Sequence, residues 1–213
     1  MQRFSLITES DARRLTPGDT VELLPGGHIT PLANDTLRDL RITVVRSGMP
    51  DEELAKLVPP ASVRTVVVGS DHTGLALKRA LLAWLRSRAL TVADVGTNSA
   101  DAVDYPDIAL AVAAPVARGE ADAGIVIDGA GLGSAIAANK VRGVRAVMAT
   151  TPTLARYGRE HNGANVLALG ATLVSEAEAR AIVETFLTTA MTEPRYIKRL
   201  AKVRQIEERG GRS

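Results

Sequence analysis

A chain of 213 residues is long enough to bury one core of ordinary domain size and to carry a smaller unit beside it. The absence of cysteine excludes disulfides and thiolate chemistry, and a net charge of +2 with 3% aromatic residues does not indicate a nucleic-acid-binding protein. With no membrane-length apolar run and no signal-peptide pattern, the chain is expected to be soluble and cytoplasmic.

Residues 1–60 are predicted to form a small α+β extension of short helices and strands. The expected elements are a helix over 9–15, a strand over 21–24, a helix over 32–40 with Thr30 as its N-cap, and a strand over 42–45. Proline and glycine predict turns at 17–19 and 25–27. The stretch 49–60 ends in two prolines and is predicted to be the linker to the next domain.

The pattern changes after residue 60, where short apolar runs alternate with amphipathic segments. Strands are predicted over 65–68, 90–95, 124–127, 144–149 and 165–169. Helices are predicted over 75–88, 106–118, 134–141, 153–160, 176–191 and 195–208. Such alternation is typical of a parallel sheet covered by helices on both faces, so we expect an α/β domain over residues 61–213.

Polar side chains gather around the predicted strand ends, where ligands of such sheets bind. Asp71 and His72 follow the first strand of this domain, Tyr105 lies in the connection after the second, and Asp128 ends the third. The pair His161-Asn162 precedes the last strand. We expect all of these side chains to line one site.

The segment after Asp128 is predicted to bind an anion. Gly129, Gly131 and Gly133 allow the backbone to turn tightly and to approach a ligand, and a helix is expected to begin at Ser134. The free N–H groups of a helix N-terminus favour negative charge. The glycine spacing matches neither a dinucleotide-binding fingerprint nor a nucleotide P-loop, so a plain glycine turn stays as the alternative interpretation.

Five motifs carry a resemblance to a known family. They are Gly69-Ser70-Asp71-His72-x-Gly74, Val103-Asp104-Tyr105-Pro106-Asp107, Gly129-x-Gly131-x-Gly133, Ala137-Ala138-Asn139-Lys140 and His161-Asn162-x-Ala164-Asn165. In this order and spacing they resemble ribose-5-phosphate isomerase type B and its galactose-6-phosphate isomerase relatives over residues 64–208. The resemblance implies a Rossmann-like domain, a homodimer or dimer of dimers with sites shared between subunits, and no metal or organic cofactor.

The resemblance also implies aldose–ketose isomerisation of a phosphorylated sugar, in the first place ribose 5-phosphate to ribulose 5-phosphate through an enediolate. His161 would open the sugar ring, a role suited to a group that titrates near neutral pH. Arg195 and Arg199 lie four residues apart on one helix face and would bind phosphate in the neighbouring subunit's site. The implied substrate-binding residues are Asp71, His72, Tyr105, Gly129, Ala130, Gly131, Leu132, Gly133, Asn162, Arg195 and Arg199.

This chain departs from the family pattern at five positions. Asp128 stands where most members have a cysteine base, and Ser134 stands where other members have a glutamate. Ala130 replaces a threonine, Thr172 an arginine and Tyr196 a histidine. Because a carboxylate can also move the proton of an enediol, we predict that Asp128 is the catalytic base.

Two alternatives to this catalytic role remain. Asp128 could merely accept hydrogen bonds from the glycine loop, which would make the chain a catalytically silent phosphosugar-binding or assembly protein. Asp71, His72, Asp128 and His161 could instead bind a metal, but their separations carry no ligand-spacing signature.

The extension lies outside the isomerase resemblance. Its segment 27–33, with Arg38 and Ile42, resembles N-terminal segments of enzymes associated with bacterial microcompartments. That resemblance implies packaging in such a compartment. The alternative is a structural appendage that lengthens the dimer interface.

Overall fold

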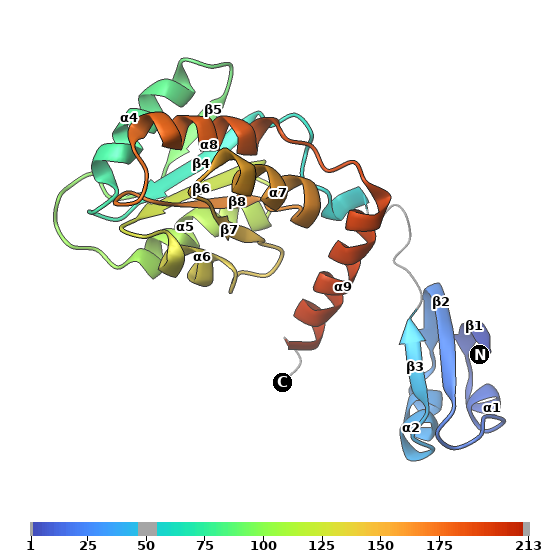
Figure 1. Cartoon of the computed structure of the whole chain (residues 1–213). Coiled ribbons are helices and arrows are strands. Elements are labelled where there is room, and N and C mark those ends of the chain that lie inside the picture. Colours follow the sequence, from blue (N-terminus) through green and yellow to red (C-terminus); the bar gives the residue numbers. More distant parts are fainter. Residues whose placement is uncertain (1, 47–54, 211–213) are drawn as a thin grey trace. The chain divides into compact units, whose positions relative to one another are not determined.

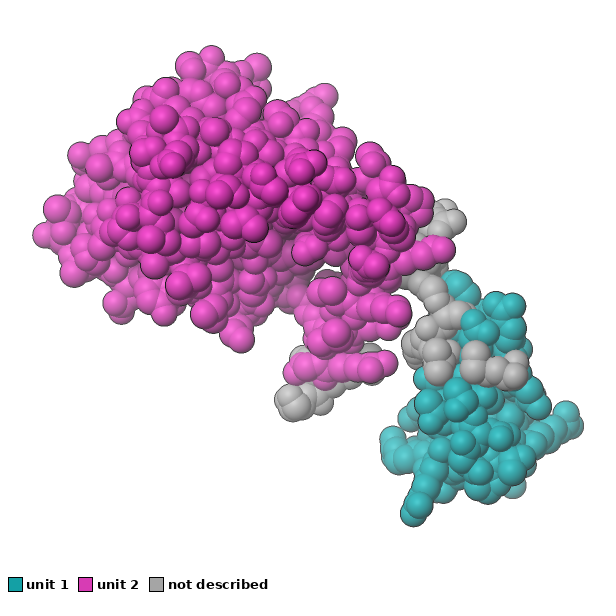
Figure 2. Space-filling model, in the orientation of Figure 1, with its two compact units in different colours: residues 1–56 teal, residues 57–213 magenta. Residues whose placement is uncertain are grey.

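The computed structural model describes residues 2–46 and 55–210, which belong to two compact units, Met1–Lys56 and Leu57–Ser213 (Figure 2). The units divide at residue 56, whereas the sequence suggested residue 60. Arginines account for the difference, because the carbonyl groups of Leu57 and Pro60 accept hydrogen bonds from Arg145 and Arg159 of the second unit. Of the predicted linker 49–60, residues 49–54 lie outside the described residues.

The first unit alternates strands and helices around a three-stranded parallel sheet (Figure 1). Its elements are β1 (Arg3–Ile7), α1 (Glu9–Ala12), β2 (Thr20–Ile29), α2 (Pro31–Asp39) and β3 (Thr43–Arg46), with β2 in the centre of the sheet. Ile7, Val21, Leu23 and Leu37 form its core with their apolar neighbours. Thr30 caps α2 as predicted, because its side-chain oxygen accepts the N–H of Ala33.

Two features of this unit differ from the sequence-based expectation. Strand β1 was not predicted, and the predicted turn at 25–27 is wrong because β2 continues through it. Leu23 pairs with Phe4 and His28 pairs with Leu6, so β2 has more residues than β1 between these two pairs. The surplus residues form a bulge rather than a chain reversal, and Gly26 adopts a left-handed φ of 71° there.

The second unit confirms the predicted α/β architecture: all five strands are parallel, in the order β5-β4-β6-β8-β7 (Figure 1). The strands are β4 (Thr65–Ser70), β5 (Thr91–Asp94), β6 (Ala123–Asp128), β7 (Ala146–Met148) and β8 (Val166–Gly170). The helices are α4 (Leu75–Arg86), α5 (Tyr105–Ala117), α6 (Leu132–Ala138), α7 (Pro152–Asn162), α8 (Glu176–Thr188) and α9 (Pro194–Gly210).

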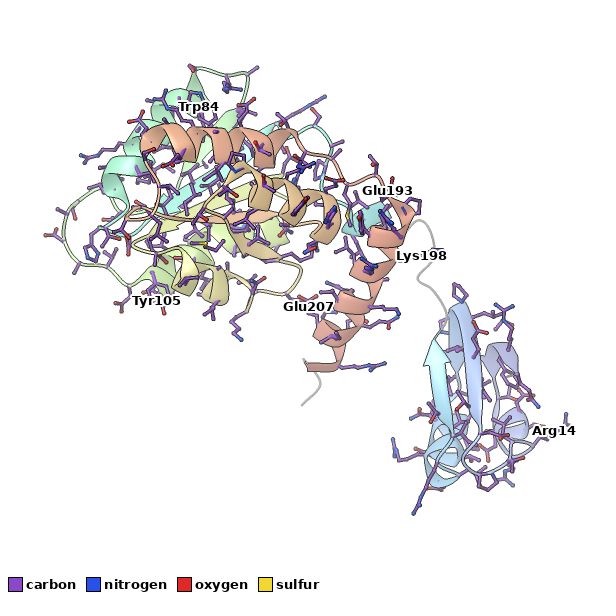
Figure 3. All side chains as sticks on the ribbon, viewed as in Figure 1. Arg14, Trp84, Tyr105, Glu193, Lys198 and Glu207 are labelled. Carbon is purple, nitrogen blue, oxygen red and sulfur yellow. The ribbon has the colours of Figure 1, made fainter. Side chains whose placement is uncertain are left out.

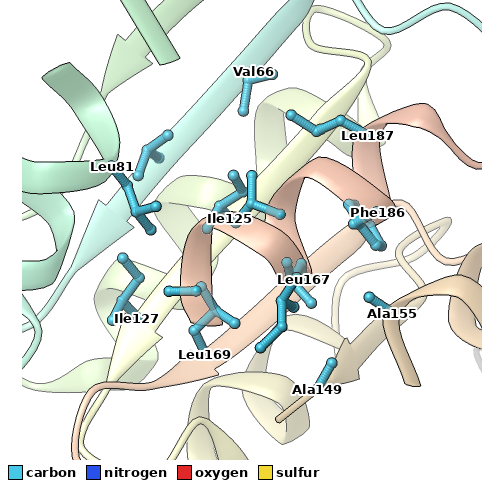
Figure 4. Packing of buried hydrophobic residues seen from close by; sticks show 14 of the residues in the cluster. Val66, Leu81, Ile125, Ile127, Ala149, Ala155, Leu167, Leu169, Phe186 and Leu187 are labelled. Carbon is cyan, nitrogen blue, oxygen red and sulfur yellow. The ribbon is translucent and has the colours of Figure 1, made fainter. Parts of the chain in front are cut away.

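Strand residues alternate between two apolar layers. Ile125, Ile127 and Leu167 pack with Leu81 of α4 and Phe186 of α8 on one face of the sheet (Figure 4). On the other face, Val126, Val166 and Ala168 pack with residues of α5 and α6. Because both faces are covered, the central strands are apolar on both sides, as their continuous hydrophobic runs suggested.

Two helix boundaries shift candidate residues out of loops. Helix α6 begins at Leu132, two residues before the predicted start, because Gly131 serves as its N-cap with a left-handed φ of 77°. Helix α7 extends to Asn162 and ends at Gly163, whose φ is 58°. Leu132 and Gly133 therefore lie in the first turn of α6, and His161 and Asn162 lie in the last turn of α7.

Candidate active site

The first group of candidate residues lies where β4 and β6 end. Strand β5 lies on one side of β4 and β6 on the other, so the strand order switches direction at β4. Ligands of doubly wound sheets bind at such a topological switch point. The N–H of Asp71 donates to the carbonyl oxygen of Ile127 at 3.1 Å, which joins the two strand ends. The candidates after both strands are thus brought together, as predicted.

Asp71 and His72 are held in defined orientations. Asp71 Oδ1 accepts the Thr73 N–H at 2.9 Å, the Thr73 hydroxyl at 2.6 Å and the Gly74 N–H at 3.1 Å. Within the described part of the chain, Asp71 Oδ2 accepts no hydrogen bond and is left for a ligand. His72 Nδ1 accepts the Val103 N–H at 3.3 Å, so a neutral His72 carries its proton on Nε2.

Asp128 turns its carboxylate into the loop that follows it. Oδ1 accepts the N–H groups of Ala130, at 2.8 Å, and of Gly131. Oδ2 accepts both the N–H of Ser134, at 3.0 Å, and its hydroxyl, at 2.5 Å. The side chain is 5% exposed, and the donors at the start of α6 stabilise its negative charge.

The glycine loop keeps a second set of N–H groups. Among the described residues, we find no acceptor for the N–H groups of Gly129, Leu132 and Gly133. The ring of Tyr105 packs so closely on Gly133 that a Cβ there would lie 2.7 Å from it. The loop donors therefore form two sets, one bound to the Asp128 carboxylate and one available to an anion.

Thr172 and Ala130, two of the departures from the family pattern, also lie at this loop. The Thr172 hydroxyl donates to the Gly129 carbonyl at 2.7 Å, and its N–H donates to the same oxygen at 3.0 Å. Thr172 therefore fixes the backbone of the loop instead of offering a cation to a phosphate. A Cβ on Gly170 would lie 2.7 Å from the backbone of Ala130, so Ala130 is held from the opposite side.

The second group of candidate residues surrounds His161. Its imidazole stacks on Tyr157, with ring centroids 4.7 Å apart and planes 14° apart, and it contacts Tyr196 with centroids 4.4 Å apart. The guanidinium groups of Arg195 and Arg199 lie 4.8 and 5.6 Å from the Tyr196 ring. Arg195 also donates to the Tyr196 hydroxyl at 3.1 Å, so Tyr196 joins the histidine to both arginines.

The two groups lie at opposite ends of the parallel strands, so one chain by itself does not bring all the candidate residues together. Gly170 at the end of β8 pairs with Asp128, whereas α7, with His161 and Asn162, ends before β8 begins at Val166. Strands rise about 3.3 Å per residue, which separates the ends of β8 by about 13 Å. In Figure 3, Tyr105 lies at one end of this unit, and Glu193, directly before α9, and Lys198 on α9 lie at the other.

The buried Arg159 and the half-buried Arg145 hold the backbone around His161, and the sequence did not reveal them. Arg159, 1% exposed, donates to the carbonyl oxygens of Ala164, Pro60 and Thr189. Burial, reinforced by the nearby charge of Arg145, lowers the pKa of Arg159 to about 10. Burial also lowers the pKa of Arg145.

The described residues contain no group of three His, Asp or Glu side chains close enough to hold a metal ion, and no helix among them is long and apolar enough to cross a membrane. A cavity of about 260 Å³ lies between α9 and residues 143–145. Its lining includes Leu57, Val203 and Ile206, but no residue of either candidate group.

Comparison with known proteins agrees with this geometry. The profile of the family described as "Ribose/Galactose Isomerase" matches residues 66–203. The chain belongs to this family. The ribose-5-phosphate isomerase B of Escherichia coli is 41% identical over 147 residues, which cover 69% of this chain and 99% of that protein. The family match excludes the first unit.

Solved structures of family members have the same fold. The ribose-5-phosphate isomerase B of Clostridium thermocellum is 46% identical, with a TM-score of 0.67 over 68% of this chain and 99% of its own. The Mycoplasma genitalium enzyme, solved with bound ribulose-5-phosphate, is 38% identical, with a TM-score of 0.66 over 69% of this chain and 98% of its own. The predicted family and fold are thus confirmed.

Proposed function

We propose that this chain isomerises a phosphorylated aldose to the corresponding ketose, and that its substrate is ribose 5-phosphate, which gives ribulose 5-phosphate. Family membership supports the reaction class, and the names of the relatives support the substrate. The observation that carries the proposal is the carboxylate of Asp128 at a strand end, beside backbone N–H groups that can receive an anion.

In this proposal, His161 opens the sugar ring and Asp128 moves the proton. Asp128 takes the proton from C2 of the open-chain aldose, the C–H electrons form a C1=C2 bond, and O1 becomes an oxyanion. The free N–H groups of Gly129, Leu132 and Gly133 stabilise this enediolate. The proton on the Asp128 carboxyl can exchange with solvent before Asp128 protonates C1, while the proton of the 2-hydroxyl passes to O1. Each atom is accounted for without an external oxidant or reductant.

A complete site requires two copies of the chain. One copy would supply the group around Asp128, and the other would supply His161, Asn162, Arg195 and Arg199. In an isologous dimer, each interface then forms two identical sites. The arginines would bind the phosphate by charge-assisted hydrogen bonds.

Exposed apolar residues beside both groups support this dimer. Leu132 and Ile136, one turn apart on α6, are 58% and 64% exposed next to the glycine loop. Val203 and Ile206 on α9 are 50% and 69% exposed on the helix that carries the arginines. Large apolar side chains exposed in such clusters mark protein interfaces.

One observation favours the alternative function, a silent phosphosugar-binding protein: the loop donors already saturate the Asp128 carboxylate. A coupled assay of ribulose 5-phosphate formation separates the two functions. Asp128→Asn should abolish turnover, while Asp39→Asn, an exposed site in the first unit, should leave it unchanged. No turnover of any pentose or hexose phosphate by the unmodified chain, with measurable binding, would favour the silent protein.

A cysteine variant sharpens this assay. The chain has no cysteine, so Asp128→Cys places the family's usual base in the protein as its sole thiol. We expect Asp128→Cys to turn over ribose 5-phosphate and to lose this activity on alkylation with iodoacetamide, while the unmodified chain is insensitive to the reagent. Turnover that survives in Asp128→Asn would remove Asp128 from the mechanism.

A further inference from the structure

The hydrogen bonds around Asp128 leave its carboxylate no vacant lone pair. An ionised carboxylate has about four lone-pair sites. Ala130 and Gly131 donate to Oδ1, and the N–H and hydroxyl of Ser134 donate to Oδ2. A base must present a lone pair to the carbon-bound proton that it removes. One of these four donors must therefore leave before Asp128 can act.

Three of the donors are backbone N–H groups that are fixed by their surroundings. Thr172 holds the Gly129 carbonyl with two hydrogen bonds, and Gly170 packs against the backbone of Ala130. The N–H of Ser134 belongs to the first turn of α6. The Ser134 hydroxyl differs, because rotation about one side-chain bond can move its hydrogen away from Oδ2.

We propose that Ser134 is a positioning residue that controls the base, an inference that rests on the proposed function. Its hydroxyl, on a side chain that is 0% exposed, donates to Oδ2 in the free enzyme and favours the ionised, inward-turned carboxylate. When the open-chain sugar binds, the hydroxyl rotates away and Oδ2 receives the C2 proton. The C–H electron pair moves into the C1=C2 bond of the enediolate, as in the proposed reaction.

Other groups near Asp128 also carry or acquire charge. Asp71 and His72 face the site from the end of β4, and Tyr105 faces it from the start of α5. In the proposed dimer, His161 of the second copy adds an imidazole. Total turnover therefore reports several ionisations, whereas exchange of the C2 proton of ribose 5-phosphate with solvent reports the base step.

The test follows the pH dependence of C2-proton exchange by NMR in D₂O for Ser134→Ala, with Ser99→Ala, an exposed loop serine, as the matched control. Without the hydroxyl, the ionised carboxylate loses one hydrogen bond. The acid limb of the exchange profile, measured at substrate concentrations below KM so that it reports the free enzyme, should then move upward by about one pH unit, while KM and the plateau rate stay close to those of the unmodified enzyme. Ser134→Thr, which keeps a hydroxyl, should restore the acid limb.

Two outcomes distinguish this inference from the proposed function. If Asp128→Asn still exchanges the C2 proton, Asp128 is not the base, and the proposed function fails together with the role of Ser134. If Asp128→Asn is inactive and Ser134→Ala keeps the acid limb of the unmodified enzyme, the base stands and Ser134 does not control it. A folded Ser134→Ala that loses both its plateau rate and its substrate affinity would also overturn the inference, because it would assign Ser134 a structural role.

Discussion

The separation of Asp128 and His161 within one chain allows a complementation experiment. Asp128→Asn damages the group at the carboxyl ends of β4 and β6, and His161→Asn damages the group at the end of α7. If each site combines one group from each copy, a mixed dimer contains one site with both defects and one site with neither. Two inactive variants should therefore restore activity when they share a dimer.

The expected recovery follows from the two-fold symmetry. Random pairing of equal amounts makes about half of the dimers mixed, and each mixed dimer has one intact site of two. The mixture should therefore reach about one quarter of the activity of the unmodified enzyme per subunit. Each variant alone should stay at its own residual level, because all of its sites carry the same defect.

The assay mixes the purified variants under conditions that allow subunit exchange and follows ribulose 5-phosphate formation over time. A mixture of Asp128→Asn with the Asp128→Asn/His161→Asn double variant is the control, because none of its sites has both groups intact. If the first mixture gains no more activity than this control although mass spectrometry detects mixed dimers, the shared site is refuted.

Three further predictions concern the glycine loop, the Asp122 carboxylate and the boundary between the two units. Gly131→Ala should cost roughly 1–3 kcal/mol of unfolding free energy in urea, because a Cβ at φ 77° would lie 2.9 Å from the Leu169 backbone. Burial acts to raise the pKa of Asp122, but hydrogen bonds from the N–H groups of residues 64–65 outweigh it and lower the pKa below the usual 3.8. The ionised Asp122 therefore stabilises the folded state fully above pH 3.8, and this stabilisation is lost as the pH falls through the pKa of the folded state. Asp122→Ala should therefore unfold about 1 kcal/mol more easily near pH 7, and acid titration should close this gap. A chain that begins at Leu57 should keep the isomerase activity in the coupled assay, because both candidate groups lie in the second unit.

Much of the second unit could be predicted because its local patterns agree with its tertiary structure. The apolar runs that end at Asp128 and Leu169 became central strands, and the polar residues after β4 and β6 meet at the sheet edge as expected. The first unit was harder to predict, since Pro25-Gly26-Gly27 carries the same signal for a bulge as for a turn. Composition alone does not separate these two outcomes.

The site was predicted only in part. His161 comes directly before the last strand, and this order by itself places it at the amino ends of the strands, since parallel strands share one direction. Arg159 carried no usable signal, because a charged residue on an amphipathic helix is normally solvated, whereas here three carbonyl groups bind it in the interior. The sequence also did not reveal how the glycine loop divides its N–H donors between Asp128 and a substrate.

The central claim is that Asp128 moves a proton between C2 and C1 of a sugar phosphate. The most direct measurement incubates ribose 5-phosphate with the enzyme in D₂O and follows deuterium at C1 of ribulose 5-phosphate by NMR. We expect solvent deuterium in the product with the unmodified chain and with Asp128→Cys, and neither product nor exchange with Asp128→Asn. Product or C2-proton exchange that persists in Asp128→Asn would contradict the claim.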